Sequence, residues 1–165
     1  MERIYFAHTV NSYSTDLEKE LVKLINDFFG TEIENPNQPH HQVGYKTWKE
    51  KYRGHPTKSG MTYFYEIVLP DCDACVCQIF LDGKWGAGVA NEALFFIKKE
   101  QSVWVINPKT HEIRPITAGE KDLIVKNDPS LMLSIEETRF RVWGGSGRYK
   151  KAVPYEQAHL LEYKP

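Results

Sequence analysis

The stretch Cys72 to Asn107, CDACVCQIFLDGKWGAGVANEALFFIKKEQSVWVIN, decides the fold class. An apolar run, Ala74 to Leu81, is typical of a buried strand, and the glycine-bearing segment Asp82 to Gly88 predicts a loop. A helical pattern with Glu92 early in it follows, and Val103 to Ile106 is a second strand-like run. Strand, loop, helix and strand form a parallel βαβ unit, whose ligands bind where loops leave the carboxyl ends of the strands. We therefore expect Glu92 to lie where chemistry is usually found.

The remaining patterns extend this unit into one α/β domain. Arg3 to Ala7 predicts a first strand, and Thr15 with Glu18 has the capping-box spacing at the start of a helix that Gly30 ends. Other expected elements are a short strand at 32–34, a loop at 35–41, helical segments around 45–52 and 61–69, a hairpin at 103–116, a strand at 131–133, and a helix from 134 to just before Gly144. The expected fold is α/β: a single-domain Rossmann-like (flavodoxin-like), mostly parallel sheet flanked by helices, spanning residues 1–165.

Composition narrows the function classes. The net charge is -1 and the pI is about 6.6, so no global charge favours nucleic acid or a membrane surface as a partner. No apolar stretch approaches the roughly 20 residues that a membrane span requires, and the N-terminal residues show no signal-peptide pattern. Three cysteines are too few for a disulfide framework, so we expect a reducing, cytoplasmic setting.

Glu92 is the leading candidate for chemistry. It falls at the edge of the apolar face of its helix, close to Phe95 and Phe96 and without Lys or Arg one turn away. Such a carboxylate has a raised pKa or a polar partner from elsewhere, and perturbed carboxylates in clefts serve as acids, bases or nucleophiles. The alternative is a glutamate in the first helical turns that only complements the helix dipole. Gly86 and Gly88, which leave space above Glu92, favour function.

Three other polar residues flank the predicted strands. His8 follows the first strand at its carboxyl end, where it can meet a ligand, although a hydrogen-bonded structural histidine fits equally well. Asp82 ends the central strand within plausible reach of Glu92, although Asp82 with Gly83 also suits a turn. Asp73 begins that strand, so geometry alone favours a structural role for it. We expect His8, Asp82, Gly86, Gly88 and Asp73 to contribute to substrate binding.

No metal or cofactor site is expected. Cys75 and Cys77 share one face of a strand and Cys72 has the opposite parity, which suits reduced core cysteines better than a tetrahedral site. His40 and His41 lie in a proline-bounded segment without partner spacing. The segment 143–151, WGGSGRYKK, is basic and glycine-rich, and fits either a phosphate-binding loop or a plain surface loop.

The segment Cys72 to Ile106, together with Ile4 to Ala7, resembles the nucleoside 2-deoxyribosyltransferase-like superfamily, which includes deoxyribosyltransferases and nucleotide N-glycosidases. Matching motifs are the opening Ile-Tyr-Phe-Ala strand, Cys72-Asp73 before an apolar strand, and the run from Gly88 to Ala93 that carries a glutamate. The resemblance covers roughly the first two thirds of the chain.

The resemblance implies a nucleoside or nucleotide as the small-molecule partner. The family's catalytic glutamate falls on Glu92 and its first-strand tyrosine on Tyr5. Glu92 would attack the anomeric carbon of a ribosyl or deoxyribosyl group, as retaining glycosidases do, and Tyr5 would orient the carboxylate. Many transferases of the family have an Asp six positions before the glutamate, where this chain has Gly86. This difference favours hydrolysis over base exchange. A homodimer or higher homo-oligomer is also implied.

Two other functions stay open from the sequence. A non-catalytic nucleotide sensor on the same fold would explain the missing Asp. A protein-interaction domain would explain the aromatic content of 13% and would present a wide exposed apolar patch.

Overall fold

The computed structural model describes residues 2–145 and 151–165 and has an α/β architecture with a four-stranded, mostly parallel sheet. The strand order is β1-β2-β3-β4, with the first three parallel and β4 antiparallel to β3. Strand bounds are β1 Ile4–Ala7, β2 Ala74–Gln78, β3 Ser102–Ile106 and β4 Ile113–Pro115. The α/β class and the mainly parallel sheet predicted from the sequence are confirmed.

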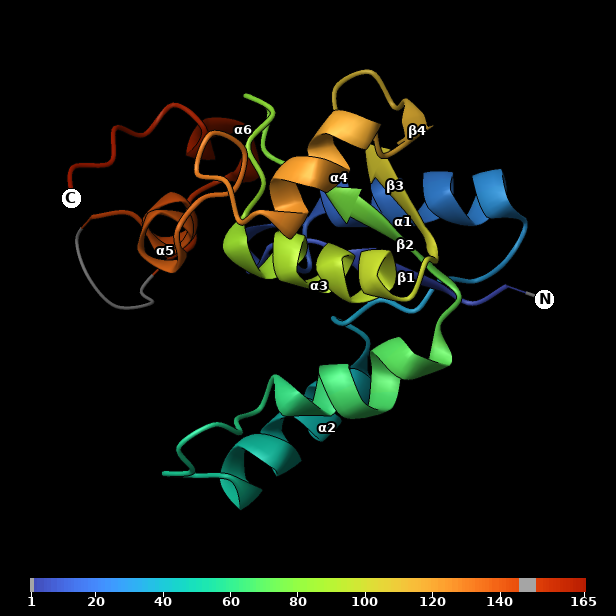
Figure 1. Ribbon diagram of the computed structural model, residues 1–165, viewed down its shortest axis with the longest axis vertical. Helices are drawn as coiled ribbons and strands as arrows, with labels where there is room; N and C mark the ends of the chain where they lie inside the picture. The colour runs from blue at the N-terminus through green and yellow to red at the C-terminus, as the bar shows by residue number, and fades with distance from the viewer. Residues whose placement is uncertain (1, 146–150) are drawn as a thin grey trace.

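Helices cover both faces of the sheet (Figure 1). Their bounds are α1 Asp16–Phe29, α2 Pro39–Lys51, α3 Ala87–Lys98, α4 Ala118–Val125, α5 Ile135–Trp143 and α6 Tyr155–Ala158. Within the described residues, no helix combines the length and the apolarity that a membrane crossing requires.

The alternation of side chains along β1 separates two buried clusters. Tyr5 and Ala7 face the cluster that contains Val89 and other residues of α3, whereas Ile4 and Phe6 face the cluster of α1. Because β1 and β2 are buried on both faces, these two strands are nearly continuous apolar runs, as in other parallel sheets. The register pairs Ala7 with Cys77, so the carboxyl ends of β1 and β2 meet at one edge.

The caps read from the sequence operate in the structure. Thr15 caps α1 by accepting a hydrogen bond from the Glu18 amide, and Gly30 ends that helix in the left-handed conformation, with φ 66°. Ser134 caps α5 in the same way, with the Glu137 amide as donor. The helix that the sequence places at 134–143 is therefore confirmed.

Several local expectations are corrected. The short strand expected at 32–34 is only an isolated parallel bridge between Glu34 and Tyr5, and the strand expected at 131–133 is a single bridge from Met132 to Trp85 outside the sheet. The expected loop at 35–41 is instead interrupted by α2, which begins at Pro39 because proline suits the first helical position. The segment around 61–69 forms a π-helical turn at Phe64–Val68 followed by a 3-10 turn at Leu69–Asp71.

Residues 39–60, which we call the α2 lobe, stand apart from the sheet at the bottom of Figure 1. Two tight contacts between a ring and a glycine backbone pack this part of the chain. A Cβ on Gly44 would lie 2.3 Å from the Tyr63 ring of the next segment, and one on Gly60 would lie 2.7 Å from the Tyr45 ring within the lobe. Only glycine permits such close approach. The lobe is therefore packed by aromatic rings rather than by aliphatic side chains.

Candidate functional site

Glu92 is carried by α3 into the interior. The helix begins after Gly86, and the Ala87 amide donates a hydrogen bond of 2.9 Å to the Thr138 hydroxyl of α5. Val89, Ala90 and Ala93 bury the same helix face in the core. Glu92 is only 6% exposed, and its Oε2 has no hydrogen-bond partner among the residues that the structure describes. A buried carboxylate oxygen without a partner is costly, so this site requires an explanation beyond folding.

Tyr5 is the protein group that Glu92 engages. Its side chain points from β1 toward α3, and its hydroxyl forms a hydrogen bond with the Glu92 carboxylate. Burial raises the pKa of Glu92 from 4.5 to about 7, and the hydrogen bond from Tyr5 opposes that rise by favouring the charged form. Near neutral pH, Glu92 is therefore balanced between the carboxylic acid and the carboxylate. The structure thus brings together Tyr5 and Glu92, the two residues that the resemblance implies act together.

Further tyrosines surround the carboxylate and were missed by the sequence analysis. Burial raises the pKa of Tyr13 and of Tyr65, and the negative charge of Glu92 raises both further. Tyr45 interacts electrostatically with Tyr13 and so belongs to the same group. Tyr13 follows β1 near the carboxyl edge of the sheet, which was a usable signal, whereas Tyr45 and Tyr65 reach the site through tertiary packing. Because their pKa values are raised, the hydroxyls of Tyr13 and Tyr65 stay protonated at neutral pH and can donate hydrogen bonds.

His8 lies on the other face of the sheet. Its Nε2 is 2.6 Å from the Glu18 carboxylate, its Nδ1 is 3.1 Å from the Phe6 carbonyl, and its ring stacks on Phe6 at 4.0 Å between centroids. Both ring nitrogens are therefore engaged within the fold. The His8 ring packs against Tyr13, with 4.8 Å between the ring centroids.

Asp82 and Asp73 both have partners within the protein, an arginine side chain for Asp82 and a backbone amide for Asp73. Asp82 accepts two hydrogen bonds from the Arg141 guanidinium, at 2.9 and 2.7 Å, and Arg141 lowers the pKa of that carboxyl. Asp73 accepts a hydrogen bond of 2.8 Å from the Arg3 amide at the amino end of β2. Neither carboxylate is placed beside Glu92, so Asp82 does not replace the acid that is absent at position 86.

The two glycines differ. Gly86 is buried, and a Cβ there would lie 3.4 Å from Phe80, Thr138 and Thr9, so an acidic side chain at this position would have to displace its neighbours. Gly88 is exposed, and a Cβ there would meet nothing within 4 Å. The start of α3 therefore has open space beside Gly88, whereas the surroundings of Gly86 are filled.

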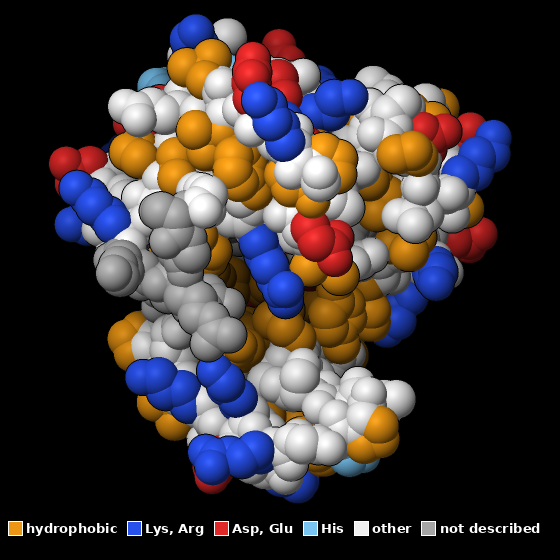
Figure 2. Space-filling model, turned by 90° about the vertical axis from the view of Figure 1, so that its left-hand side faces the viewer, with side chains coloured by type: hydrophobic (Ala, Val, Ile, Leu, Met, Phe, Trp, Pro, Cys, Tyr) orange, Lys and Arg blue, Asp and Glu red, His pale blue; other side chains and the backbone are white. Residues whose placement is uncertain are grey.

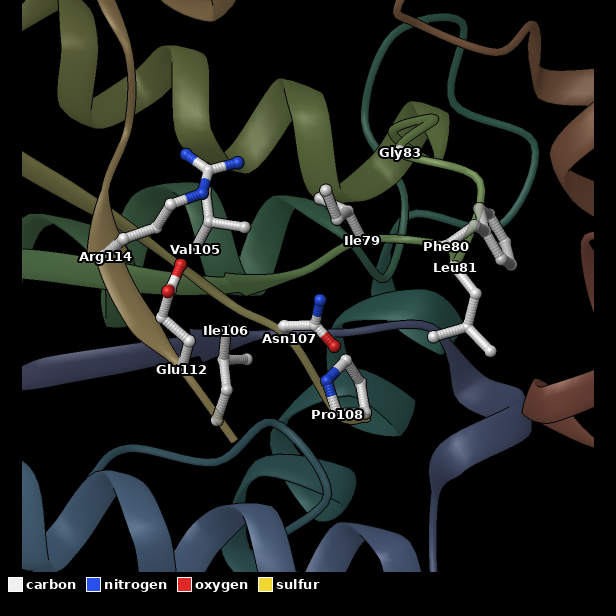
Figure 3. Close-up of a pocket in the computed structure, with 10 residues that line it drawn as sticks. All are labelled: Ile79, Phe80, Leu81, Gly83, Val105, Ile106, Asn107, Pro108, Glu112 and Arg114. Atoms are coloured by element: carbon white, nitrogen blue, oxygen red, sulfur yellow. The ribbon is translucent and has the colours of Figure 1, made fainter. Parts of the chain in front are cut away.

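A cavity of about 190 Å³ lies at the carboxyl ends of β2 and β3 (Figure 3). Its cation, Arg114, forms hydrogen bonds of 2.7 and 3.1 Å to Glu120, and the Asn107 side-chain oxygen accepts from the amides of Lys109 and Thr110. Since these polar groups are already satisfied, the cavity offers less chemistry than the surroundings of Glu92.

Glu34, His40 and His41 have ligand atoms within 4.8 Å of one another, a grouping that could hold a metal ion and that the sequence analysis did not expect. The His41 ring, however, is 2.8 Å from both the Tyr63 hydroxyl and the Glu34 carboxylate, and Glu34 also pairs with Arg3. These contacts satisfy Glu34 and His41 without an ion and fasten the α2 lobe to the edge of the sheet.

The surface is hollowed between the α2 lobe and the body that contains the sheet. Hydrophobic side chains, a class that contains tyrosine in Figure 2, line much of the hollow. Tyr45 comes from the lobe and Tyr65 from the segment that follows it, and both are partly exposed. The tyrosine group around Glu92 therefore draws on both sides of this junction. The glycine-rich segment that the sequence analysis singled out lies largely, at residues 146–150, outside the described residues.

Comparisons with protein-family models, with curated proteins and with solved structures found no match to this chain.

Proposed function

We propose that this protein cleaves the N-glycosidic bond of a nucleoside, a nucleotide or a related compound, as an N-glycosidase or a (deoxy)ribosyltransferase, with Glu92 as the nucleophile. One observation carries the proposal: the buried Glu92 carboxylate has one oxygen without a protein partner and a neighbouring tyrosine hydroxyl from β1. A nucleophile requires a lone pair free to attack and a partner that holds the carboxylate in place.

The sheet supports the same reading. The bridge of Glu34 to Tyr5 places a fifth parallel segment beside β1, on the side opposite β2. The resulting order is that of doubly wound sheets such as flavodoxin, in which ligands bind outside the carboxyl ends of the strands. We infer a Rossmann-like, flavodoxin-like domain of the nucleoside 2-deoxyribosyltransferase-like superfamily.

In the proposed reaction, the Glu92 carboxylate attacks the anomeric carbon of the sugar. The bond from that carbon to the base breaks through an oxocarbenium-like transition state, and the bonding electrons leave with the base. Water then attacks the glycosyl ester, its proton passes to solvent, and the free carboxylate is regenerated. Tyr5 holds Glu92 through both steps.

The departing base must receive a proton or a hydrogen bond. Asp82 is paired with Arg141, and Gly86 replaces the acid of the family pattern, so no second carboxylate fills this role among the described residues. Tyr13 and Tyr65, which remain protonated at neutral pH, are the available donors beside Glu92. Hydrolysis of substrates with a good leaving base therefore fits better than base exchange.

The test is release of free base from a panel of nucleosides, nucleotides and NAD, followed by chromatography. We expect release by the natural protein and a loss of at least about 100-fold in Glu92→Gln, because the amide lacks the nucleophilic charge. Glu136→Gln, which changes an exposed carboxylate of α5, is the matched control. No release from any compound, or equal release by Glu92→Gln, would overturn the proposal.

A second candidate is a nucleotide sensor that binds without turnover. It is favoured by the absence of a second carboxylate beside Glu92 in the described part of the chain. Calorimetric binding of a nucleotide that stays intact after long incubation would support this function. Detectable base release that depends on Glu92 would exclude it.

A further inference from the structure

The α2 lobe concentrates positive charge. Between residues 39 and 60 the chain has five Lys or Arg and one Glu, a net charge of +4, so the rest of the chain carries -5 for the total of -1. Lys and Arg side chains gather on the lobe below the hollow (Figure 2). This asymmetry is not explained by the proposed chemistry at Glu92, and it creates a local field that attracts anions.

A pocket of about 620 Å³ lies at the carboxyl-terminal end of α2. Its lining alternates cations with small and aromatic residues and consists of Lys46, Lys49, Glu50, Tyr52, Arg53, Gly54, His55, Lys58 and Ser59. Lys46 and Lys49 lie three residues apart on α2, so their side chains project along the same side of the helix, and Arg53 follows in the turn after the helix. Four cations therefore converge on one concave site.

Two of these four cationic side chains form no ion pair within the described part of the protein. Lys46 and Lys49 have no ion-pair partner in the described ranges 2–145 and 151–165. Arg53 pairs with Glu50 at 2.5 Å and Lys58 with Glu66 at 3.4 Å, but all four side chains are substantially exposed. Exposed pairs contribute little energy and can be exchanged for a stronger anion.

The walls of the pocket are held in place before any ligand arrives. The His55 Nδ1 accepts hydrogen bonds from the amides of Thr57 and Lys58, at 3.1 and 2.9 Å, which order the loop after the helix. The Lys58 ammonium lies 5.2 Å from the centre of the Tyr52 ring. A preformed site loses less entropy on binding than a flexible one.

We propose that this pocket binds the phosphate chain of a nucleotide. Several phosphate groups in series match four converging cations, because lysine and arginine form strong charge-assisted hydrogen bonds with phosphate oxygens. The small size of the pocket and the net negative charge of the rest of the chain disfavour a long nucleic acid, which needs a continuous basic surface. This site is separate from Glu92, and its test does not depend on catalysis.

The experiment measures binding of inorganic tripolyphosphate and of a nucleoside triphosphate to the whole protein by calorimetry, at low and at near-physiological salt. We expect both to bind, with affinity falling as salt rises, and a loss of about tenfold or more in the double variant Lys46→Gln/Lys49→Gln. The matched control is Lys98→Gln/Lys121→Gln, which removes two exposed lysines from α3 and α4.

Absence of binding by both compounds, or equal binding by the pocket variant and the control variant, would overturn the proposal. A single-stranded oligonucleotide is measured in parallel. If it binds more tightly than the triphosphate and depends on Lys46 and Lys49, the pocket recognises nucleic acid and the nucleotide assignment is wrong. Changes in NMR chemical shift that are confined to residues 46–59 on addition of tripolyphosphate would support the assignment independently of any variant.

Discussion

At the scale of single residues, the unusual feature is the state of Glu92. Burial disfavours its charge, the Tyr5 hydroxyl favours it, and the balance leaves a pKa of about 7. A folded-state pKa above the ordinary value means that the folded protein holds the proton more tightly than the unfolded chain does. The stabilisation associated with that proton is complete below about pH 4.5 and is lost as pH rises through about 7.

Glu92→Gln should therefore change the pH dependence of stability. The difference between 4.5 and about 7 corresponds to about 3 kcal/mol. We expect the variant to be about as stable as the natural protein near pH 4.5 and more stable by up to about 3 kcal/mol near pH 8, as measured by urea unfolding. A constant difference across this pH range would contradict the assigned pKa.

Tyr5→Phe should raise the pKa of Glu92 further, because it removes the hydrogen bond that favours the carboxylate. An upward shift on the order of 1 unit is expected from the loss of one such bond. NMR titration of carbon-labelled glutamate side chains measures this shift without any assay of activity. Tyr163→Phe, at a tyrosine that packs on Phe140 instead, serves as the control and should leave the titration unchanged.

At the scale of elements, several boundaries follow from local chemistry and others from packing. Thr117 and Glu120 form a capping box that begins α4, a pattern that is visible in the sequence. By contrast, nothing local explains why 131–133 forms one bridge instead of a strand: that segment is held by Trp85 from a distant loop. The packing of α2 depends on two contacts with residues 60–64: the Tyr63 ring lies against Gly44, and the Tyr45 ring lies against Gly60.

Gly44→Ala should destabilise the packing of α2. Alanine is the better helix former, by about 1 kcal/mol, but its Cβ would lie 2.3 Å from the Tyr63 ring and overpacking costs about 1–3 kcal/mol. We expect a net loss of stability of about 1 kcal/mol by urea unfolding and faster amide exchange along α2. Gly119→Ala, in α4 with its nearest neighbour at 4.0 Å, should instead be neutral or slightly stabilising.

At the scale of the whole molecule, the sheet body and the α2 lobe bring together two different properties: a buried carboxylate among tyrosines and an exposed basic pocket. The lobe is tied to the sheet edge by the chain of contacts from Arg3 through Glu34 and His41 to Tyr63. The hollow between lobe and body therefore has fixed walls on both sides.

The resemblance implies a homodimer or a larger homo-oligomer. Sedimentation equilibrium should give a mass of at least twice 19.1 kDa at micromolar concentration. A concentration-independent monomer would contradict this expectation without bearing on Glu92, because Tyr5 and the other tyrosines beside it belong to the same chain.

The sequence alone determined the α/β class, the mainly parallel sheet and the main caps, because these depend on local periodicity and on capping chemistry. The pairing of Glu92 with Tyr5 was an expectation from the resemblance. Only the tertiary structure decided which polar residues share the site. Side-chain parity turned His8 to the opposite face, Arg141 engaged Asp82, and the packing of distant segments brought Tyr13 and Tyr65 to Glu92. Such pairings are set by contacts between residues far apart in the chain, and no local pattern encodes them.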